Sequence, residues 1–191
     1  MSSQPTGPSF SSGGGVLAVV GNPRPGSRTA QVASAALAAA AAAGGLPAPD
    51  ADADLLDLGA AQVELGPPLG ADSASRYAGP LERLHAARLV VVATPTYKGS
   101  YTGLLKAFLD HVAAGALHRT VAVPLITVGS PAHTLAADVH LRPLLVELGA
   151  LTPTASLVVT EAELADAGRA AALLDTWAER AAPALRALLA G

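Results

Sequence analysis

The stretch "VLAVVGNPRPGSRTAQV" (16–32) decides the fold. Its first five residues are apolar and partly β-branched, which is typical of a buried strand. A loop of glycine, proline, arginine and hydroxyl side chains follows at 21–29, and an alanine-rich stretch then continues to Gly44 and Gly45. This order predicts a strand, a tight loop, and a helix that begins near Ser27 and ends at the two glycines.

The same strand–helix order recurs along the rest of the chain. Further strands are predicted at 52–58, 88–95, 120–128 and 152–159, and helices at 78–87, 102–113, 132–148 and 163–189. We expect Pro143 to kink the third of these helices and Pro183 to break the last. The strands are apolar along their whole length, as a parallel sheet covered on both faces requires. The predicted fold class is therefore α/β: a three-layer, doubly wound, five-stranded parallel sheet.

Length and composition favour one globular domain. The chain has 191 residues, of which 51% are hydrophobic and 14% are charged, so there is enough apolar material for a core. Residues 1–15 are polar and are predicted to be a disordered leader, followed by a single domain at 16–191. The leader lacks the features of a secretory signal, so we expect a cytoplasmic protein.

Several classes of site and partner are excluded by the same numbers. The chain contains no cysteine, which excludes disulfides, thiolate metal sites and thiol nucleophiles. The net charge is −3 without a basic cluster, so we expect no nucleic-acid partner, and no apolar run is long enough to span a membrane. The pairs His111/His118 and His133/His140 are seven residues apart, too far on a helix to share one metal ion.

Three polar loops follow predicted strands and should meet at one edge of the sheet, where ligands bind in such folds. In the first loop, 21–29, hydrogen-bonding side chains, two arginines and the start of a helix favour an anion, although an ordinary strand–helix turn remains the alternative. Gly21 and Gly26 have the spacing of a nucleotide-binding P-loop, but Ser27 stands where that motif has lysine, which excludes an NTPase.

The second and third loops have the chemistry to contact a planar ring. The second, "TPTYKGSYTG" (94–103), offers an aromatic side chain at Tyr97 and backbone amides from Thr96 to Gly99 that we expect to be free. The third, "TVGSPAH" (127–133), carries small hydroxyls and a histidine. A tight turn and a helix cap by Ser130 are the structural alternatives.

Three segments together resemble a known family. They are "VVGNPRPGSRT" (19–29), "VATPTYKGSYTGLLKAFLDHV" (92–112) and "ITVGSPAH…LRPLLVELGA" (126–150), and they look like the NADPH-dependent FMN reductases of the flavodoxin-like fold. The likeness is greatest to the FMN reductases that serve alkanesulfonate monooxygenases, although those usually carry tyrosine where this chain has Val139.

The resemblance implies an FMN site built from all three loops. Its phosphate would be held by Asn22, Arg24, Ser27, Arg28 and Thr29. Its isoalloxazine ring would be bordered by Pro95, Thr96, Tyr97, Lys98 and Gly99. The other side would be closed by Thr127, Gly129, Ser130 and His133. No catalytic proton donor is implied, because the cofactors carry the reactivity and the protein positions them.

The implied activity is hydride transfer from NADPH or NADH to FMN, with the reduced flavin supplied to a partner monooxygenase. The alternatives are a quinone or azo reductase that retains FMN, a flavodoxin-type electron carrier, and a domain that binds another phosphorylated ligand. The resemblance also implies a homodimer or homotetramer, and apolar residues on the predicted helix 102–113 are candidates for its interface.

Overall fold

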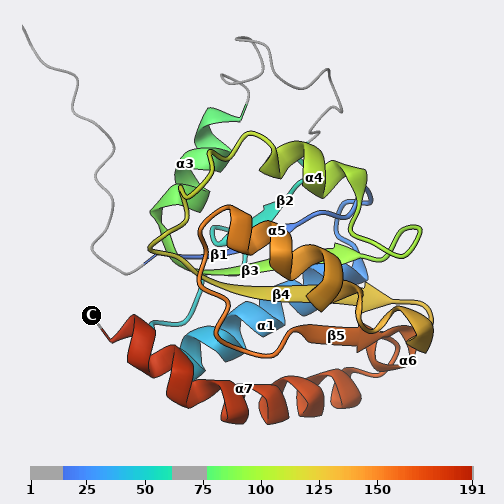
Figure 1. The fold of residues 1–191 in the computed structure, drawn as a ribbon. Coiled ribbons are helices and arrows are strands. Elements are labelled where there is room, and N and C mark those ends of the chain that lie inside the picture. Colours follow the sequence, from blue (N-terminus) through green and yellow to red (C-terminus); the bar gives the residue numbers. More distant parts are fainter. Residues whose placement is uncertain (1–14, 62–76, 191) are drawn as a thin grey trace, which may run out of the picture.

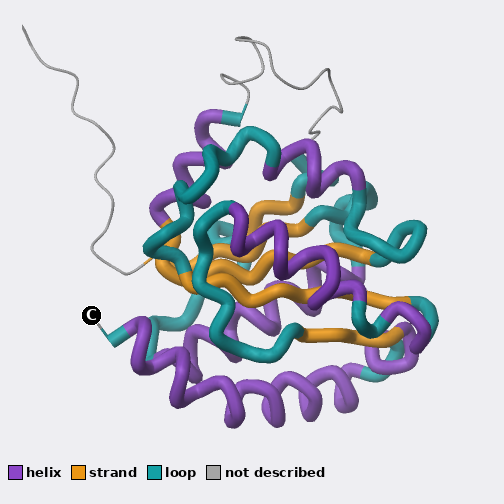
Figure 2. The backbone as a smooth tube through the Cα atoms, viewed as in Figure 1, coloured by secondary structure: helices purple, strands orange, loops and turns teal. Residues whose placement is uncertain are grey.

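In a computed structural model, the structure describes residues 15–61 and 77–190. Five parallel strands form one sheet in the order β2-β1-β3-β4-β5. They are β1 (Gly15–Val20), β2 (Leu55–Asp57), β3 (Ala87–Pro95), β4 (Val121–Val128) and β5 (Leu157–Thr160). Figure 2 shows these strands side by side, with the connecting loops gathered at the two ends of the sheet. The chain order reverses between β1 and β3, which makes their carboxyl ends the expected ligand site of this topology.

Helices cover both faces of the sheet (Figure 1). They are α1 (Arg28–Gly44), α3 (Ala78–Ala86), α4 (Gly103–Leu109), α5 (Arg142–Glu147), α6 (Glu161–Leu164) and α7 (Ala167–Leu189), with the short 3₁₀ and π turns η1 (Pro131–His133) and η2 (Ala137–Leu141) before α5. Helices α1 and α7 pack on one face, and α3, α4 and α5 pack on the other. Alternate strand residues point into these two cores, which explains why the strands are apolar throughout. The predicted three-layer α/β fold is confirmed.

Helix α1 has the limits that its sequence predicts. The hydroxyl of Ser27 accepts a hydrogen bond from the Ala30 amide, and Gly45 ends the helix in the left-handed conformation, with φ of 75°. Strand β1 begins at Gly15, one residue earlier than predicted, and the rest of the predicted leader lies outside the described residues.

Two strands are shorter than predicted, because their polar N-terminal parts, 52–54 and 152–156, do not pair in the sheet. Before β2, the side chain of Asp50 accepts hydrogen bonds from the amides of Asp52 and Ala53, so this part of 52–58 is a turn. Before β5, residues 152–156 leave the sheet and pairing with β4 begins only at Leu157. In both places local polar contacts replace the strand ladder.

The bulge at 152–156 explains why β4 tolerates Pro124. Leu151 exchanges backbone hydrogen bonds with Thr120 and Ala122 on the outer side of β4, and pairing resumes at Leu125. Pro124 lies between these points, two residues beyond Ala122, so its missing N–H faces the gap that the bulge leaves.

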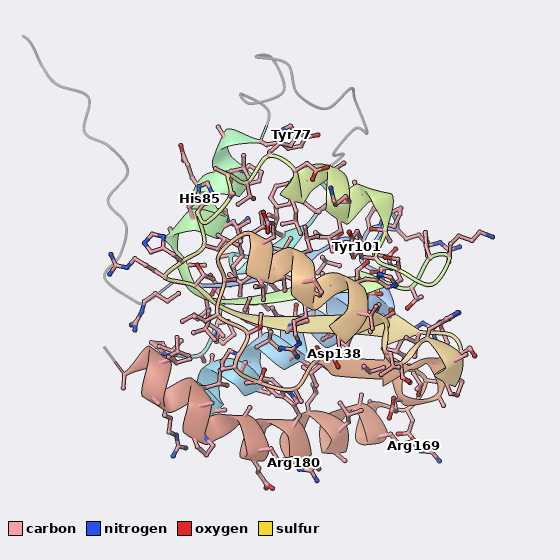
Figure 3. The ribbon with its side chains drawn as sticks, viewed as in Figure 1. Tyr77, His85, Tyr101, Asp138, Arg169 and Arg180 are labelled. Atoms are coloured by element: carbon pink, nitrogen blue, oxygen red, sulfur yellow. The ribbon has the colours of Figure 1, made fainter. Side chains whose placement is uncertain are left out.

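The bulge is tied to the π turn η2 by a small ionic network. The guanidinium of Arg142 donates to the carbonyls of Thr152 and Thr154, each at 2.9 Å, and to the hydroxyl of Ser156 at 2.8 Å. Asp138, labelled in Figure 3, accepts from Arg142 Nε at 2.8 Å and from the Ser156 hydroxyl at 2.7 Å. This network fixes the outer edge of the sheet against the helix that covers it.

Three helix predictions need correction. The predicted helix 132–148 divides into η1, η2 and α5, and Pro143 lies in the first turn of α5, where its missing N–H costs little. Helix α7 continues through Pro183 because its buried residues hold it against α1 and the core beneath it, and the break falls instead at Asp166, which caps α7.

The predicted helix 102–113 ends at Leu109 as α4. Its apolar residues do not form an exposed surface: they are buried in the core of the chain itself, which makes the predicted interface on this helix wrong. The residues are Leu104, Leu105, Phe108, Leu109 and Val112. Across the described ranges, no helix combines the length and the apolar character that crossing a bilayer requires.

We predict that Asp138→Asn destabilises the protein by about 1 kcal/mol at neutral pH, because the amide loses the charge-assisted bonds to Ser156 and Arg142. The hydrogen bond from Ser156, and then Arg142, hold the pKa of Asp138 below its ordinary value of 3.8. A carboxylate whose pKa is lowered by folding stabilises the protein at pH values above its unfolded-state pKa. This stabilisation is lost as the pH falls through the folded-state pKa.

Urea unfolding at a series of pH values checks this prediction. The difference in unfolding free energy between the native protein and the variant should be constant well above pH 3.8 and should shrink as the pH falls below that value. Asp175→Asn, an exposed carboxylate on α7, is the matched control and should show no such difference. A difference that persists unchanged to pH 2 contradicts the assignment.

Candidate functional site

A cavity of about 300 Å³ lies at the carboxyl ends of the strands. In Figure 1 this is the end toward which the strand arrows point, where α6 follows β5. The loops after β1, β3 and β4 and the start of α6 contribute its walls. The lining residues are Asn22, Arg24, Ser27, Arg28, Thr29, Pro95, Tyr97, Thr127, Glu161 and Leu164. The structure thus brings together eight of the residues that the sequence predicted for one site.

The wall formed by the first loop presents donors suited to an anion. Arg28 is the first residue of α1, and Ser27 is its N-cap. Within the described part of the chain, the amides of Arg28 and Thr29 have no hydrogen-bond acceptor. These amides lie at the positive end of the helix dipole and beside two guanidinium groups, so the donor set fits a phosphate group.

A chain of buried hydrogen bonds forms the back of the cavity. Asn22 Nδ2 donates to Thr29 Oγ1 at 3.1 Å, and Thr29 Oγ1 lies 3.1 Å from Thr127 Oγ1. Asn22 Oδ1 accepts from the amide of Arg24 at 3.0 Å, which folds the loop back on itself. Asn22, Thr29 and Thr127 are all buried. Their polar atoms are largely engaged with one another, so they position the loop more than they present donors.

Two residues that the sequence did not single out hold the first loop from outside. The carboxylate of Asp57, at the end of β2, accepts from the amides of Gly26 at 2.9 Å and Gly59 at 3.1 Å. The hydroxyl of Thr102 donates to the carbonyl of Gly21 at 2.5 Å. Asp57 was recognisable as a polar residue at the carboxyl end of a predicted strand, but its partner is 31 residues away.

Gly21 is required by close packing of β1 against α4. A Cβ atom at this position would lie 2.4 Å from the Cβ of Leu105, which is shorter than any normal contact. The loop therefore leaves β1 in direct contact with the first turn of α4, which only a residue without a Cβ allows.

The charges of the cavity are unequal. Among the described residues, the Arg24 side chain has no ion-pair partner, while Arg28 Nη2 lies 2.5 Å from Glu161 Oε2. Both members of that pair are about half exposed, at 53% and 55% of their side chains. Two guanidinium groups face one carboxylate, so the site keeps a net positive charge. Glu161 and Leu164 were not predicted, although Glu161 directly follows β5 and Leu164 ends the short helix α6 that begins there.

The second loop forms a tight turn beside the cavity. Tyr97 and Ser100 exchange backbone hydrogen bonds, and Lys98 and Gly99 between them have positive φ values of 54° and 81°. Positive φ at both central positions is the signature of a type I′ turn. The ring of Tyr97 is 47% exposed.

The expectation of free amides from Thr96 to Gly99 is wrong for the first two. The amide of Thr96 donates to the carbonyl of Thr127, and that of Tyr97 donates to Ser100. The amides of Lys98 and Gly99 have no acceptor among the described residues. Any polar contact from this backbone to a ligand therefore falls to the tip of the turn.

In the third loop, Ser130 caps a helical turn, which was the structural alternative to a role in ligand binding. Ser130 Oγ accepts from the amide of Ala132 at 3.3 Å and begins η1, and His133 ends that turn in an exposed position. Six predicted residues lie on the loops around the cavity without lining it. They are Thr96, Lys98, Gly99, Gly129, Ser130 and His133.

Comparison with curated proteins finds reductases of flavin mononucleotide. The chain is 37% identical over 142 residues to the NADH-dependent FMN reductase SfnF of Pseudomonas fluorescens (strain Pf0-1), covering 69% of this chain and 73% of that protein. It is 46% identical over 69 residues to the FMN reductase (NADPH) of Escherichia coli (strain K12), which is 36% of either chain.

Solved structures show the same fold over most of the chain. The apo form of an NADH:FMN oxidoreductase (EMOB) is 30% identical, with a TM-score of 0.66 and coverage of 89% of both chains. An oxidoreductase from Corynebacterium diphtheriae is 28% identical, with a TM-score of 0.71 and coverage of 94% of this chain and 98% of that one.

The family described as "NADPH-dependent FMN reductase" matches residues 15–163, from the first residue of β1 into α6. This span contains every strand of the sheet and every residue that lines the cavity except Leu164. The chain therefore belongs to the NADPH-dependent FMN reductase family, as a flavodoxin-like oxidoreductase that uses FMN and a reduced nicotinamide cofactor.

Proposed function

We propose that the cavity at the carboxyl ends of the strands holds the phosphate of FMN. The observation that carries this proposal is the donor set: Arg24, Arg28 and the unpaired amides at the start of α1 line one small cavity. Guanidinium groups and helix N-termini are the groups that bind phosphate in proteins. The buried Asn22–Thr29–Thr127 chain fixes this loop before any ligand arrives, so little ordering cost remains for binding.

The turn at 97–100 and the third loop are proposed to contact the ring system. The exposed face of Tyr97 offers apolar contact, and the amides of Lys98 and Gly99 offer donors to a polar ring edge. When bound, FMN supplies the hydride-accepting chemistry that no side chain here provides. The contribution of the chain is to orient the two cofactors and to exclude water from between them.

We further propose that FMN exchanges with solution and that its reduced form serves a partner monooxygenase in the cytoplasm. A cavity of about 300 Å³ is at the small end of ligand sites, so it suits the phosphate end of the flavin better than the whole molecule. Relatives with NADH and with NADPH in their names are both similar to this chain, so both coenzymes belong in the first assays.

The activity is tested by mixing the purified protein with free FMN and NADPH or NADH and following the nicotinamide absorbance. We expect multiple turnovers with FMN in excess over protein. Turnover only with a quinone or a dye would favour the flavin-retaining reductase, and bound flavin without nicotinamide oxidation would favour an electron carrier.

The phosphate assignment is tested with Arg24→Ala. Losing one charge-assisted contact should weaken FMN binding by about tenfold or more while leaving riboflavin, which has no phosphate, unaffected. Ser27→Gly is the second variant, because Gly preserves most of the capping that Ala would remove from α1. Flavin fluorescence titration gives both dissociation constants.

Arg119→Ala is the matched control for these variants. Arg119 is exposed and precedes β4, at the opposite edge of the sheet from the cavity. Its loss should leave FMN affinity unchanged. Equal FMN affinity in the native protein, Arg24→Ala and Ser27→Gly would contradict the phosphate site.

An exposed apolar stripe is proposed as the contact between copies of the chain. Leu135, Val139 and Val146 are 69%, 58% and 55% exposed; Leu135 lies in the turn before η2, Val139 in η2 and Val146 in α5. Apolar side chains gathered on one surface helix are typical of interfaces. This stripe replaces the predicted surface on α4, which is buried in the core.

Substitution within this stripe tests the proposal. Leu135→Asp combined with Val139→Asp should convert a homodimer or homotetramer to monomer, because charges would be buried at the contact. Light scattering coupled to gel filtration measures the mass. Leu188→Asp, an exposed leucine on α7 on the other side of the sheet, should leave the assembly intact. A native protein that is monomeric at micromolar concentration contradicts the proposal.

A further inference from the structure

We propose that Glu161 competes with the FMN phosphate for Arg28 and thereby keeps the flavin exchangeable. The inference rests on the proposed function, because it assumes that the phosphate binds in the cavity lined by Arg24 and Arg28. It assigns Glu161 an effect on FMN binding opposite to that of the arginines: removing its carboxylate should tighten the binding of FMN.

The carboxylate of Glu161 already occupies one of the two guanidinium groups. Glu161 Oε2 lies 2.5 Å from Arg28 Nη2, and both residues line the cavity. In the described part of the chain the Arg24 side chain has no such partner. A phosphate that enters the cavity therefore meets one available guanidinium group and one that is already neutralised from within the chain.

The position of Glu161 is fixed by the start of α6. Thr160 caps this helix, and its amide and hydroxyl donate to Glu163 Oε2 at 2.6 and 2.7 Å. Glu163 is thereby engaged in capping its own helix. Glu161, two residues earlier, is left to face α1, where Arg28 is held as the first residue of that helix. Both ends of the bridge are thus set by capped helix starts.

The electrostatic balance favours competition. An ion pair that is about half exposed contributes little net stability, so a phosphate with more charge can displace the carboxylate from Arg28. The displaced carboxylate still belongs to the wall of a cavity of about 300 Å³, so it lies within several ångströms of any anion bound there. Both effects lower the affinity for the phosphate.

The opposite possibility is that Glu161 orients Arg28 for the phosphate. Orientation by a carboxylate is strongest when both of its oxygens bind the two ends of the guanidinium fork. Here only one contact joins the pair, between Nη2 and Oε2. Such a contact leaves the guanidinium free to turn, so the loss of competition should outweigh the loss of orientation.

A reductase that must pass reduced flavin to another protein benefits from this arrangement. Oxidised and reduced FMN carry the same phosphate, so Glu161 weakens the binding of both and shortens the residence of the product. The arginines attract the flavin, and the carboxylate limits how long it stays.

Glu161→Gln tests the proposal, with FMN and riboflavin as the two probes. We expect the FMN dissociation constant to decrease by about tenfold, with a slower dissociation rate in stopped-flow displacement, while riboflavin affinity is unchanged. Glu179→Gln, an exposed carboxylate on α7 without an ion pair among the described residues, is the matched control and should alter neither.

The same substitution in an Arg28→Gln background isolates the competition. There the gain in FMN affinity should be smaller, because the competition for Arg28 is gone and only the repulsion between the Glu161 carboxylate and the phosphate remains to be relieved. An unchanged or weaker FMN affinity in Glu161→Gln overturns the inference. So does a gain in FMN affinity that is as large in the Arg28→Gln background as in the native one, or a gain in riboflavin affinity equal to the gain for FMN.

Failure of the proposed function would look different. In that case the native protein would bind FMN no better than riboflavin, and Arg24→Ala would not change the FMN dissociation constant. Both the phosphate site and the role of Glu161 would then be rejected. If Arg24→Ala weakens FMN binding and Glu161→Gln does not strengthen it, only the role of Glu161 is rejected.

Discussion

The buried hydrogen-bond chain from Asn22 through Thr29 to Thr127 is the contact on which the site depends. It joins the loop after β1, the first turn of α1 and the end of β4 behind one small cavity. Buried polar groups are costly unless they are paired, so this chain admits few alternative arrangements of the loop. The arginines and helix amides in front of it can then present donors without first having to be ordered.

Different residues of the site hold the first loop in place and face the cavity. Residues at the back and outside, such as Asp57 and Thr102, hold the loop by its backbone, and only the arginines and free amides face outward. A cofactor that carries its own reactivity needs positioning and charge more than acid–base groups.

The edge of the sheet beyond β4 shows how one irregularity requires another. Pro124 cannot donate to a neighbouring strand, and the chain bulges beside it at 152–156, where Arg142 and Asp138 hold the bulge in place. The same Arg142 begins α5, directly after the π turn η2. The edge of the sheet, the bulge and α5 are therefore packed together. Strand β5 begins after the bulge, and Glu161, which lines the cavity, directly follows its end.

The amino-acid sequence by itself determined the layers, the limits of α1 and the three loops that meet at one edge, because apolar runs and glycine stops act locally. It did not determine where the ladders end: 52–54 and 152–156 are polar segments that adjoin apolar runs and were predicted as strand, but the Asp50 turn and the contacts of Arg142 hold them outside the sheet. Nor did it indicate that the apolar face of 102–113 is buried, or that Asp57 and Glu161 act on a loop 31 and 133 residues away. Those contacts exist only once the sheet has brought its carboxyl ends together, so only the tertiary structure could supply them.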